Sequence, residues 1–247
     1  MRRGEFLDRR LATVYDAECP WGRDDDFFLS VVNEIPRARV LDLGCGTGRL
    51  TLALAAAGHR VTGVDPAQAS LDAARAKPGG DRVTWLEGTS RVLPDRAFDI
   101  AVLTSHVAQE ICADDEWART LADLRRALVP GGRLAFDSRD PAARRWERWN
   151  PDESRRRLAL ADGTAVDAWT ELTQVRDGLV KFLHHYRFPD GEEVCSPGTL
   201  RFRTEAELRA SLTTAGFTVE RVCGGWAGEP VGASDDGELI MIARPAA

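Results

Sequence analysis

The amino-acid sequence predicts an α/β fold with a mostly parallel sheet of seven strands, the last of which runs antiparallel to the others. Between residues 38 and 138, short runs of β-branched and apolar residues alternate with helical patterns, which is typical of βαβ units. The final two strands are joined by a segment rich in Gly, Pro and Asp, without helical periodicity. Because a parallel return needs a crossover, usually a helix, the last strand is expected to be antiparallel.

Each element of this fold has a local signal. Strands are expected over 39–43, 60–65, 82–87, 98–104, 132–138, 217–223 and 238–244. Helices are expected over 24–34, 48–57, 67–76, 114–128 and 204–216. Gly58 suits a helix C-terminus because glycine adopts left-handed backbone angles, and Pro130-Gly131 does not continue a helix. Thr204 and Glu207 form a capping-box pattern that begins the last helix.

Residues 139–203 depart from this alternation and are expected to form an insert. Its arginine-rich first part, residues 139–157, is expected to contain a helix and a loop. An Asp177-Gly178 turn between two extended runs predicts a β-hairpin, and a third run would complete a small antiparallel sheet. The three extended runs are 166–172, 180–188 and 198–203.

Composition excludes several classes of function. The chain has 33 Lys and Arg against 39 Asp and Glu, a net charge of −6, whereas a nucleic-acid-binding domain is normally basic. Its longest apolar run, residues 50–57, is far shorter than the ~20 residues that cross a bilayer. We therefore expect a small-molecule partner, no nucleic acid and no membrane, with the protein acting as a monomer or a homodimer.

The cysteines and histidines predict a cytoplasmic protein without a metal site. The five cysteines are odd in number, widely scattered and without a Cys-x-x-Cys pair, as expected of free thiols in a reducing compartment. Apart from the neighbours His184 and His185, the four histidines have no spacing typical of metal ligands.

The most informative stretch runs from Val40 to Leu50 and reads as an apolar strand, a glycine-rich turn and a helix. Glycines allow the turn to bend tightly and allow a ligand to approach the backbone. Asp65 ends the following strand, where an acidic side chain can accept hydrogen bonds from two ribose hydroxyls. The glycines alone would indicate only a tight turn, but together with Asp65 they predict a nucleoside-cofactor site.

The spacing of the glycines indicates which kind of nucleoside cofactor is bound. The turn has Gly44, Gly46 and Gly48, but Arg49 stands where a dinucleotide fingerprint has its third glycine. Asp42 precedes the turn, and its charge suits an ammonium better than a pyrophosphate. These features resemble the class I S-adenosyl-L-methionine-dependent methyltransferases, whose first motif is hydrophobic-Asp-hydrophobic-Gly-x-Gly-x-Gly. Their fold is a Rossmann-like seven-stranded sheet with an antiparallel last strand.

The resemblance covers roughly residues 36–138 and the closing helix and strands, and it implies roles for individual residues. The glycines would line the amino-acid part of the cofactor, and Asp65 would hold its ribose. Thr89 stands where Asp is commoner in the family, so adenine contacts would come from Thr89 and Ser90. Thr104 would border the sulfonium, and Tyr15 would close over the cofactor. The implied cofactor-binding residues are Tyr15, Asp42, Gly44, Cys45, Gly46, Gly48, Asp65, Pro66, Thr89, Ser90 and Thr104.

Methyl transfer from a sulfonium is an in-line displacement, so the protein mainly supplies alignment, and a base helps where the acceptor arrives protonated. His106 is the first candidate base because it follows the carboxyl end of a strand and an unperturbed imidazole titrates near pH ~6.5. His184 and Tyr186 are further catalytic candidates on the apolar stripe of the 180–188 run. All three have a purely structural alternative.

Two residues are candidates for acceptor binding. Arg139 can pair with a substrate carboxylate through its planar fork or form a surface salt bridge with Asp137 or Asp140. Trp146 either packs under the insert or forms a wall of the acceptor pocket.

The insert is similar to those of small-molecule methyltransferases, in which added strands cover the acceptor. It predicts a substrate-covering lid, 139–203, inserted in a cofactor domain formed by 1–138 and 204–247. Thr104-Ser105-His106 replaces the Asn-Pro-Pro-Tyr of base-modifying enzymes, which argues against a nucleic-acid substrate.

The leading hypothesis is transfer of a methyl group to a nitrogen or oxygen of a small molecule, with carbon also open. The alternatives are an NAD-dependent oxidoreductase, which would share the sheet and the acidic ribose contact, and a non-catalytic S-adenosylmethionine-binding protein.

Overall fold

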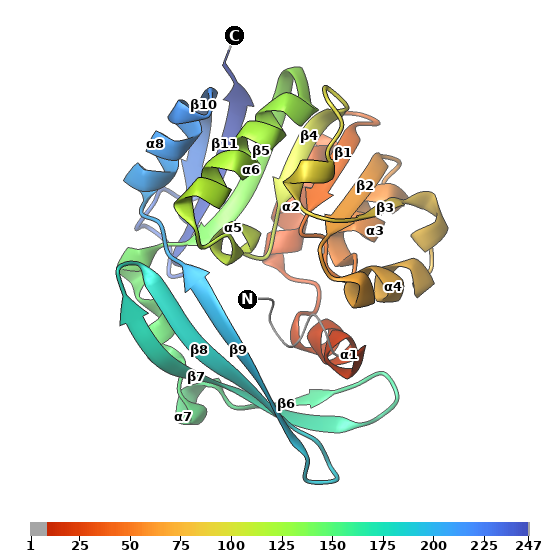
Figure 1. Cartoon of the computed structure of the whole chain (residues 1–247), viewed down its shortest axis with the longest axis vertical. Helices are drawn as coiled ribbons and strands as arrows, with labels where there is room; N and C mark the ends of the chain where they lie inside the picture. The colour runs from red at the N-terminus through yellow and green to blue at the C-terminus, as the bar shows by residue number, and fades with distance from the viewer. Residues whose placement is uncertain (1–8, 247) are drawn as a thin grey trace.

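The computed structural model describes residues 9–246, and its larger sheet has seven strands in the order β10-β11-β5-β4-β1-β2-β3 (Figure 1). These strands are β1 (Arg39–Leu43), β2 (Arg60–Asp65), β3 (Thr84–Glu87), β4 (Phe98–Leu103), β5 (Leu128–Arg139), β10 (Phe217–Cys223) and β11 (Glu238–Pro245). The pairs among β1 to β5 are parallel, whereas β11 is antiparallel to both β5 and β10. The predicted sheet and its antiparallel last strand are confirmed.

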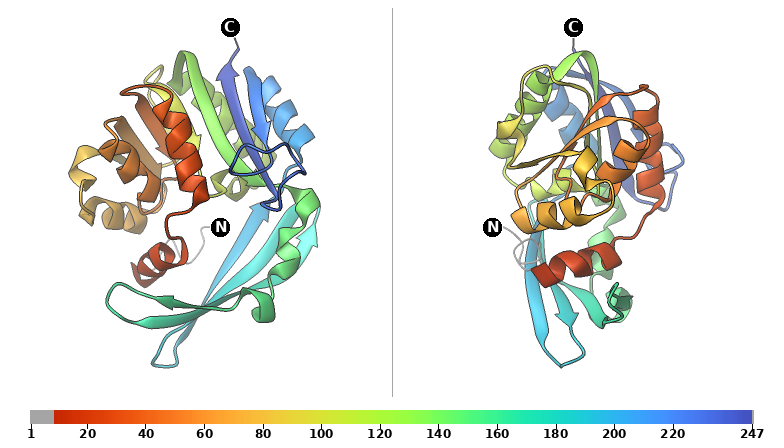
Figure 2. Two further views of the ribbon diagram at one scale, coloured as in Figure 1. Left: turned by 180° about the vertical axis from the view of Figure 1, so that it is seen from behind. Right: turned by 90° about the vertical axis from the view of Figure 1, so that its right-hand side faces the viewer.

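Helices cover both faces of this sheet (Figures 1 and 2). They are α1 (Arg9–Glu18), α2 (Arg23–Asn33), α3 (Arg49–Ala56), α4 (Gln68–Ala76), α5 (Val107–Glu110), α6 (Asp114–Ala127), α7 (Pro151–Ser154) and α8 (Glu205–Thr214). Helices α2 and α3 share a buried cluster with Val40, while α6 and α8 share another with Leu41. Consecutive strand residues reach opposite cores because side chains alternate across a strand.

The insert forms a separate four-stranded antiparallel sheet in the order β6-β7-β8-β9. Its strands are β6 (Arg156–Ala159), β7 (Ala165–Arg176), β8 (Leu179–Arg187) and β9 (Glu193–Arg201). Asp177 and Gly178 both have positive φ, as a two-residue hairpin of type I′ requires, so the predicted hairpin is confirmed. Strand β5 leads into the insert, and helix α1 lies between the two sheets (Figures 1 and 2).

Two strands of the insert differ from the prediction. β6 was not expected, because it is four residues long and only Leu158 is buried, which leaves no alternation to detect. β9 begins at Glu193 and not at 198, since Pro197 and Gly198 interrupt the pattern but remain paired with β8. A Cβ on Gly198 would lie 2.3 Å from the Phe182 ring, so only glycine fits there.

The helix expected within 139–157 is replaced by two 3₁₀ turns, Pro141–Ala143 and Arg145–Arg148, and the single-turn helix α7. Arg144 has a left-handed φ of 46°, which interrupts the helical conformation between the two turns. Asn150 caps α7. Trp146 and Trp149 therefore do not share a long helical face. Both instead pack in a cluster with Phe202 at the base of the insert.

The boundaries of several strands in the main domain also differ from the predicted ones. β3 begins at Thr84 and not at 82, because Gly80–Arg82 forms a 3₁₀ turn. β5 begins four residues earlier than predicted and passes through Pro130-Gly131 with a register shift against β4. Helices α1 and α5 were not predicted. Among the helices of residues 9–246, none has both the length and the apolar character needed to cross a membrane.

Trp146 provides a test of how the insert is anchored. Its side chain is 9% exposed and meets Phe202 edge-on, with 4.7 Å between ring centroids. Trp146→Ala should lower the free energy of unfolding by about 3–5 kcal/mol, because it leaves a cavity. Denaturant titration measures this loss. Trp21→Ala, at a side chain 43% exposed, is the control and should change it by less than ~0.5 kcal/mol. Equal effects would contradict the packing role.

Candidate active site

The glycine-rich turn after β1 has left-handed backbone at each of its three glycines, with φ of 80° at Gly44, 54° at Gly46 and 80° at Gly48. Their surroundings differ. A Cβ at Gly44 would lie 2.6 Å from Val107, and one at Gly48 would lie 2.7 Å from Trp85. A Cβ at Gly46 would meet only the Tyr15 ring, at 4.0 Å. Gly44 and Gly48 thus permit close packing, whereas the backbone at Gly46 faces open space that a ligand can use.

Asp65 connects the end of β2 to this turn. Its Oδ2 accepts a hydrogen bond from the Gly46 amide at 2.9 Å, and its Oδ1 accepts one from the Ala67 amide at 2.8 Å. The side chain is 7% exposed. Carboxylate oxygens can accept more than one hydrogen bond, so this oriented group is suited to receive ribose hydroxyls as well.

A cavity opens beneath the turn, between the ends of β1 and β4. Its lining includes five residues implied by the family resemblance: Tyr15, Asp42, Gly44, Cys45 and Thr104. The rest of the lining comes from Thr47, Arg49, Leu50, Ser105 and Val107. The ends of parallel strands on either side of a switch in strand order are where open α/β sheets bind ligands.

Asp42 is the charged group at the base of this cavity. Its Oδ2 accepts a hydrogen bond from Thr51 at 2.6 Å, whereas its buried Oδ1 has no hydrogen-bond partner among residues 9–246. Burial raises the pKa of Asp42 to about 6. A buried oxygen without a partner is costly, so an ammonium reaching this oxygen would be stabilised. The cavity therefore fits the amino-acid end of S-adenosylmethionine.

The adenine-binding assignments stay predictions. Thr89 precedes a short 3₁₀ turn after β3, next to Gly88, whose amide donates to the Asp65 carbonyl at 3.0 Å. Ser90 is buried and its hydroxyl donates to Asp123 on α6 at 2.8 Å. Because that hydroxyl is hydrogen-bonded to α6, Ser90 would contact a cofactor through its backbone. Pro66 follows Asp65 and, with Thr89 and Ser90, lies outside the cavity lining.

Arg49 is a site residue that the sequence analysis did not identify as functional. Its guanidinium donates to the Cys19 carbonyl at 3.0 Å and to Ser105 Oγ at 3.1 Å, and it lies 3.2 Å from the buried carboxylate of Asp25. These partners are distant in sequence, so no local pattern reveals the contact. Arg49 thereby ties the segment between α1 and α2 to the turn that follows β4.

Helix α1 is held over the glycine turn by a second set of polar contacts. Thr47 Oγ1 donates to Asp16 at 2.5 Å. Lys77 Nζ lies 2.8 Å from the Asp16 carboxylate and donates to the Thr47 carbonyl at 2.8 Å. These bonds position the adjacent Tyr15 at the cavity.

His106 belongs to a buried acidic cluster beside this cavity. Its backbone amide donates to Asp137 Oδ2 at 2.9 Å, and its Nε2 lies 3.0 Å from Glu238 Oε2 and 3.3 Å from Asp137 Oδ2. Ser105, which lines the cavity, and His106 both have left-handed backbone, with φ of 55° and 64°. Two such non-glycine residues in succession are strained, and strain of this kind concentrates at functional sites.

Burial controls the charges of the cluster. It raises the pKa of Asp137 to about 6 and of Glu238 to about 8, and it lowers the pKa of His106 to about 4. Asp137 Oδ1 and Gln109 Nε2 are buried without a hydrogen-bond partner in the described part of the chain. The cluster thus holds fewer negative charges at neutral pH than its composition suggests, and it contains one acceptor atom and one donor atom that no described residue satisfies.

Arg139 lies at the edge of the same cluster. It donates from Nη1 to Gln109 Oε1 at 3.1 Å, and its guanidinium lies 5.8 Å from the centre of the Trp149 ring. Its assignment to a substrate carboxylate stays a prediction.

The other catalytic candidates have partners in the insert and α1. The Tyr186 hydroxyl donates to Glu18 Oε2 at 3.0 Å, and His184 Nδ1 lies 2.9 Å from Thr170 Oγ1. Neither lines the cavity beneath the turn. Trp146, a candidate for acceptor binding, lies in the apolar cluster at the base of the insert. Catalytic and substrate roles for these three residues stay predictions.

Comparisons with known proteins identify the family. Residues 40–132 match a family described as a methyltransferase domain. The chain is 33% identical over 211 residues to the cypemycin N-terminal methyltransferase of a Streptomyces species, covering 83% of this chain and 82% of that protein. The chain belongs to the class I S-adenosylmethionine-dependent methyltransferases.

Further similarities agree with this assignment. The methyltransferase is 29% identical over 212 residues to the malonyl-[acyl-carrier protein] O-methyltransferase of Serratia marcescens, covering 85% of this chain and 76% of that protein. The CcbJ methyltransferase of Streptomyces caelestis has the same fold, with a TM-score of 0.76, 23% identity and 96% of each chain covered. S-adenosylmethionine is the cofactor, and this replaces the nicotinamide alternative.

The glycine turn yields a paired prediction. Gly46→Ala should weaken S-adenosylmethionine binding at least ten-fold because its methyl group enters the space above the turn, while the left-handed backbone costs about 1–2 kcal/mol of stability. Gly48→Ala should cost about 2–5 kcal/mol, since it adds a clash with Trp85. Calorimetric titration and denaturant unfolding measure the two effects. Similar stability losses in both variants would contradict the steric difference.

The raised pKa of Glu238 predicts a pH dependence of stability. Between its ordinary pKa of 4.5 and its folded pKa of about 8, the folded chain holds a proton that the unfolded chain releases. This carboxyl therefore lowers stability as pH rises through that window. Glu238→Gln removes this contribution, so the variant should gain thermal stability relative to the wild type from pH 5 to 8.

Melting temperatures across this pH range test the effect. Glu116→Gln, at an exposed position on α6, is the matched control and should follow the wild-type profile. Parallel profiles for the wild type and Glu238→Gln would show that Glu238 does not titrate in this window.

Proposed function

We propose that this methyltransferase transfers the methyl group of S-adenosylmethionine to an amine nitrogen of a small-molecule acceptor. The observation that carries the proposal is the buried cluster of His106, Asp137 and Glu238 beside the cofactor cavity. When bound, S-adenosylmethionine supplies an electrophilic methyl group on a positively charged sulfur.

The cluster is suited to bind an amine. Asp137 is fully buried and Glu238 is 8% exposed. Burial raises the pKa of both carboxyl groups, so they keep their protons to higher pH. An acceptor nitrogen carries N–H donors that satisfy the Asp137 Oδ1 left without a partner within residues 9–246. A carboxylate acceptor would instead meet like charge.

The same cluster can accept the proton that an amine must lose. An ammonium has no lone pair with which to attack the methyl carbon, so one N–H proton has to leave before or during transfer. Glu238 contacts neutral His106 and can accept this proton in its ionised form, which becomes the main form as pH rises through its raised pKa of about 8. The nitrogen then forms its bond to carbon as the carbon–sulfur bond breaks.

Residues 139–203 would act as the lid of this site, and residues 1–138 and 204–247 as the cofactor domain. β6 to β8 of the lid share an apolar cluster with Leu11 and Val14 of α1. Arg156 also forms an ion pair with Glu18, the last residue of α1. Because α1 carries Tyr15, closure of the lid and coverage of the cofactor would be coupled, which excludes water from the transfer.

The relatives support two acceptor chemistries. The cypemycin enzyme is named for N-terminal methylation, and the Serratia enzyme is named an O-methyltransferase of malonyl-acyl-carrier protein. The buried carboxylates favour nitrogen over an anionic oxygen acceptor.

The test uses the methyl-labelled cofactor and matched panels of small amines, alcohols, phenols and carboxylates. Labelled product is expected from amines. Product from carboxylates or hydroxyl compounds alone would overturn the amine proposal, and tight cofactor binding without turnover of any panel would favour a non-catalytic binding protein.

His106 is tested by His106→Asn, because asparagine tolerates a left-handed backbone but supplies no base. We expect kcat to fall about 10²–10⁴-fold, the contribution of general acid–base catalysis, because the variant loses the imidazole that contacts Glu238. The dissociation constant for S-adenosylmethionine should change less than two-fold. Turnover at the wild-type rate would assign His106 a structural role only.

A further inference from the structure

A cluster of side chains of the types that bind metal ions lies on the outer face of the insert, away from α1. Pairing of the strands aligns Trp169 on β7, His185 on β8 and Cys195 on β9 in one row. Glu193 precedes Cys195 by two residues and so shares its face of β9. The inner face of the same sheet contacts α1 through residues such as Tyr186, so this row faces the opposite way.

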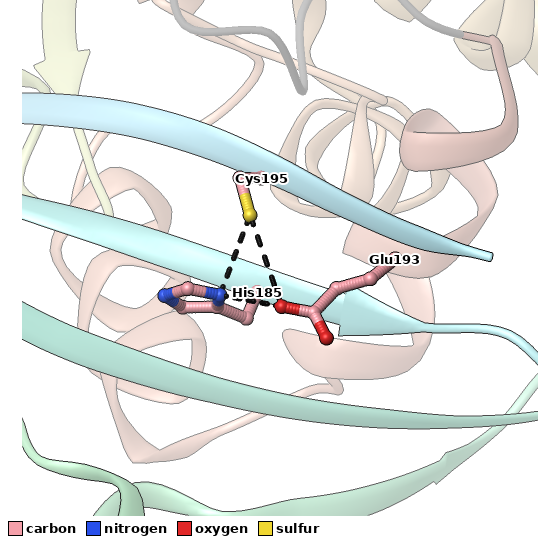
Figure 3. Close-up of side chains that lie close together, drawn as sticks. All are labelled: His185, Glu193 and Cys195. Atoms are coloured by element: carbon pink, nitrogen blue, oxygen red, sulfur yellow. Dashed lines mark hydrogen bonds and ion pairs between the residues drawn. The ribbon is translucent and has the colours of Figure 1, made fainter. Parts of the chain in front are cut away.

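Three ligand atoms of this cluster converge on one point (Figure 3). His185 Nδ1 lies 3.0 Å from Glu193 Oε1 and 3.4 Å from Cys195 Sγ, and that sulfur lies 3.9 Å from the same carboxylate oxygen. In a tetrahedral zinc site with ordinary bond lengths, nitrogen, oxygen and sulfur ligands lie about 3.3–3.6 Å apart. The three distances in the cluster fall within half an ångström of that range.

The surrounding residues orient the imidazole as a ligand. The ring is stacked on Trp169, with centroids 4.8 Å apart and planes 7° apart. Its far nitrogen, Nε2, is buried and lies 3.3 Å from the Glu171 carboxylate, without a hydrogen bond among residues 9–246. Histidines that bind a metal through one nitrogen usually donate the other N–H to a carboxylate, which fixes the tautomer. Arg187 contacts Glu193 Oε2 at 3.0 Å and leaves Oε1 toward the cluster.

A nucleophilic cysteine is the alternative role for this cluster, and the surroundings of the thiol argue against it. In a catalytic triad, the nucleophile and the carboxylate contact opposite nitrogens of the imidazole, so that a proton passes through the ring. Here Cys195 contacts Nδ1 and the Glu171 carboxylate lies near Nε2, but Glu193 also contacts Nδ1 and competes with the thiol for it. Burial and the Glu193 carboxylate also raise the pKa of the Cys195 thiol, so it is not an activated thiolate. Three ligand atoms that lie this close to one another can instead bind a shared metal ion.

We propose that His185 Nδ1, Glu193 Oε1 and Cys195 Sγ bind one zinc ion, with water as the fourth ligand. Binding forms a zinc–sulfur bond and releases the thiol proton to solvent, so the charges balance. The ion would join β8 to β9 beside the turn that connects them and would stiffen this end of the insert. The sequence pattern did not indicate a metal site because His185 meets Glu193 and Cys195 only through the pairing of β8 with β9.

Cobalt titration of the full-length, chelator-treated protein tests the proposal, with zinc competition measuring zinc affinity. Thiolate coordination to Co²⁺ produces an intense near-ultraviolet charge-transfer band. We expect this band to saturate at one equivalent of metal and to disappear when zinc is added. The acidic cluster at His106 contains no thiol and cannot produce this band.

Variants separate the site from adventitious metal binding. Cys195→Ser should abolish the band and weaken zinc binding at least 100-fold, and Glu171→Gln should weaken it 10–100-fold, the range for carboxylates behind a metal ligand. Cys112→Ser is the matched control, since Cys112 donates to the Thr199 carbonyl and belongs to no such cluster among the described residues. A band that persists in Cys195→Ser, or no band in the wild type, would overturn the proposal.

Discussion

The site is built on one constraint: parallel strands in a sheet end at the same edge. The ends of β1 and β2 meet there through the hydrogen bond from the Gly46 amide to Asp65, which holds the glycine turn in its left-handed form. The ends of β4 and β5 meet at the same edge through His106 and Asp137. Cofactor cavity and acidic cluster are therefore neighbours because of the strand order.

Buried carboxylates give this edge its chemistry. Asp42 and Asp137 each have one carboxylate oxygen with a partner and one buried oxygen without a partner in residues 9–246. Such oxygens destabilise the free protein and are stabilised by N–H donors from a ligand. The two groups flank the Thr104–His106 turn, one on the cofactor side and one on the side assigned to the acceptor. A cationic donor complements this arrangement, and so would the amine acceptor that we propose.

The antiparallel last strand has a role beyond closing the sheet. Because β11 runs opposite to β5, its first residue, Glu238, lies opposite Arg139, the last residue of β5. A parallel strand would have placed its first residue at the other edge. The reversal that the sequence predicts from a segment without helical periodicity thus adds a carboxyl group to the cluster.

Local patterns in the sequence were sufficient to predict the α/β class, the seven strands, the antiparallel last strand and the Asp177-Gly178 hairpin, since periodicity and turn chemistry act over a few residues. They also indicated Asp42, the glycine turn and Asp65. Only the tertiary structure brought Glu238 to His106, Arg49 to Ser105, and His185 to Cys195. These contacts depend on strand order and register, which bring together residues 10 to 132 positions apart in the chain, and no local propensity encodes that alignment.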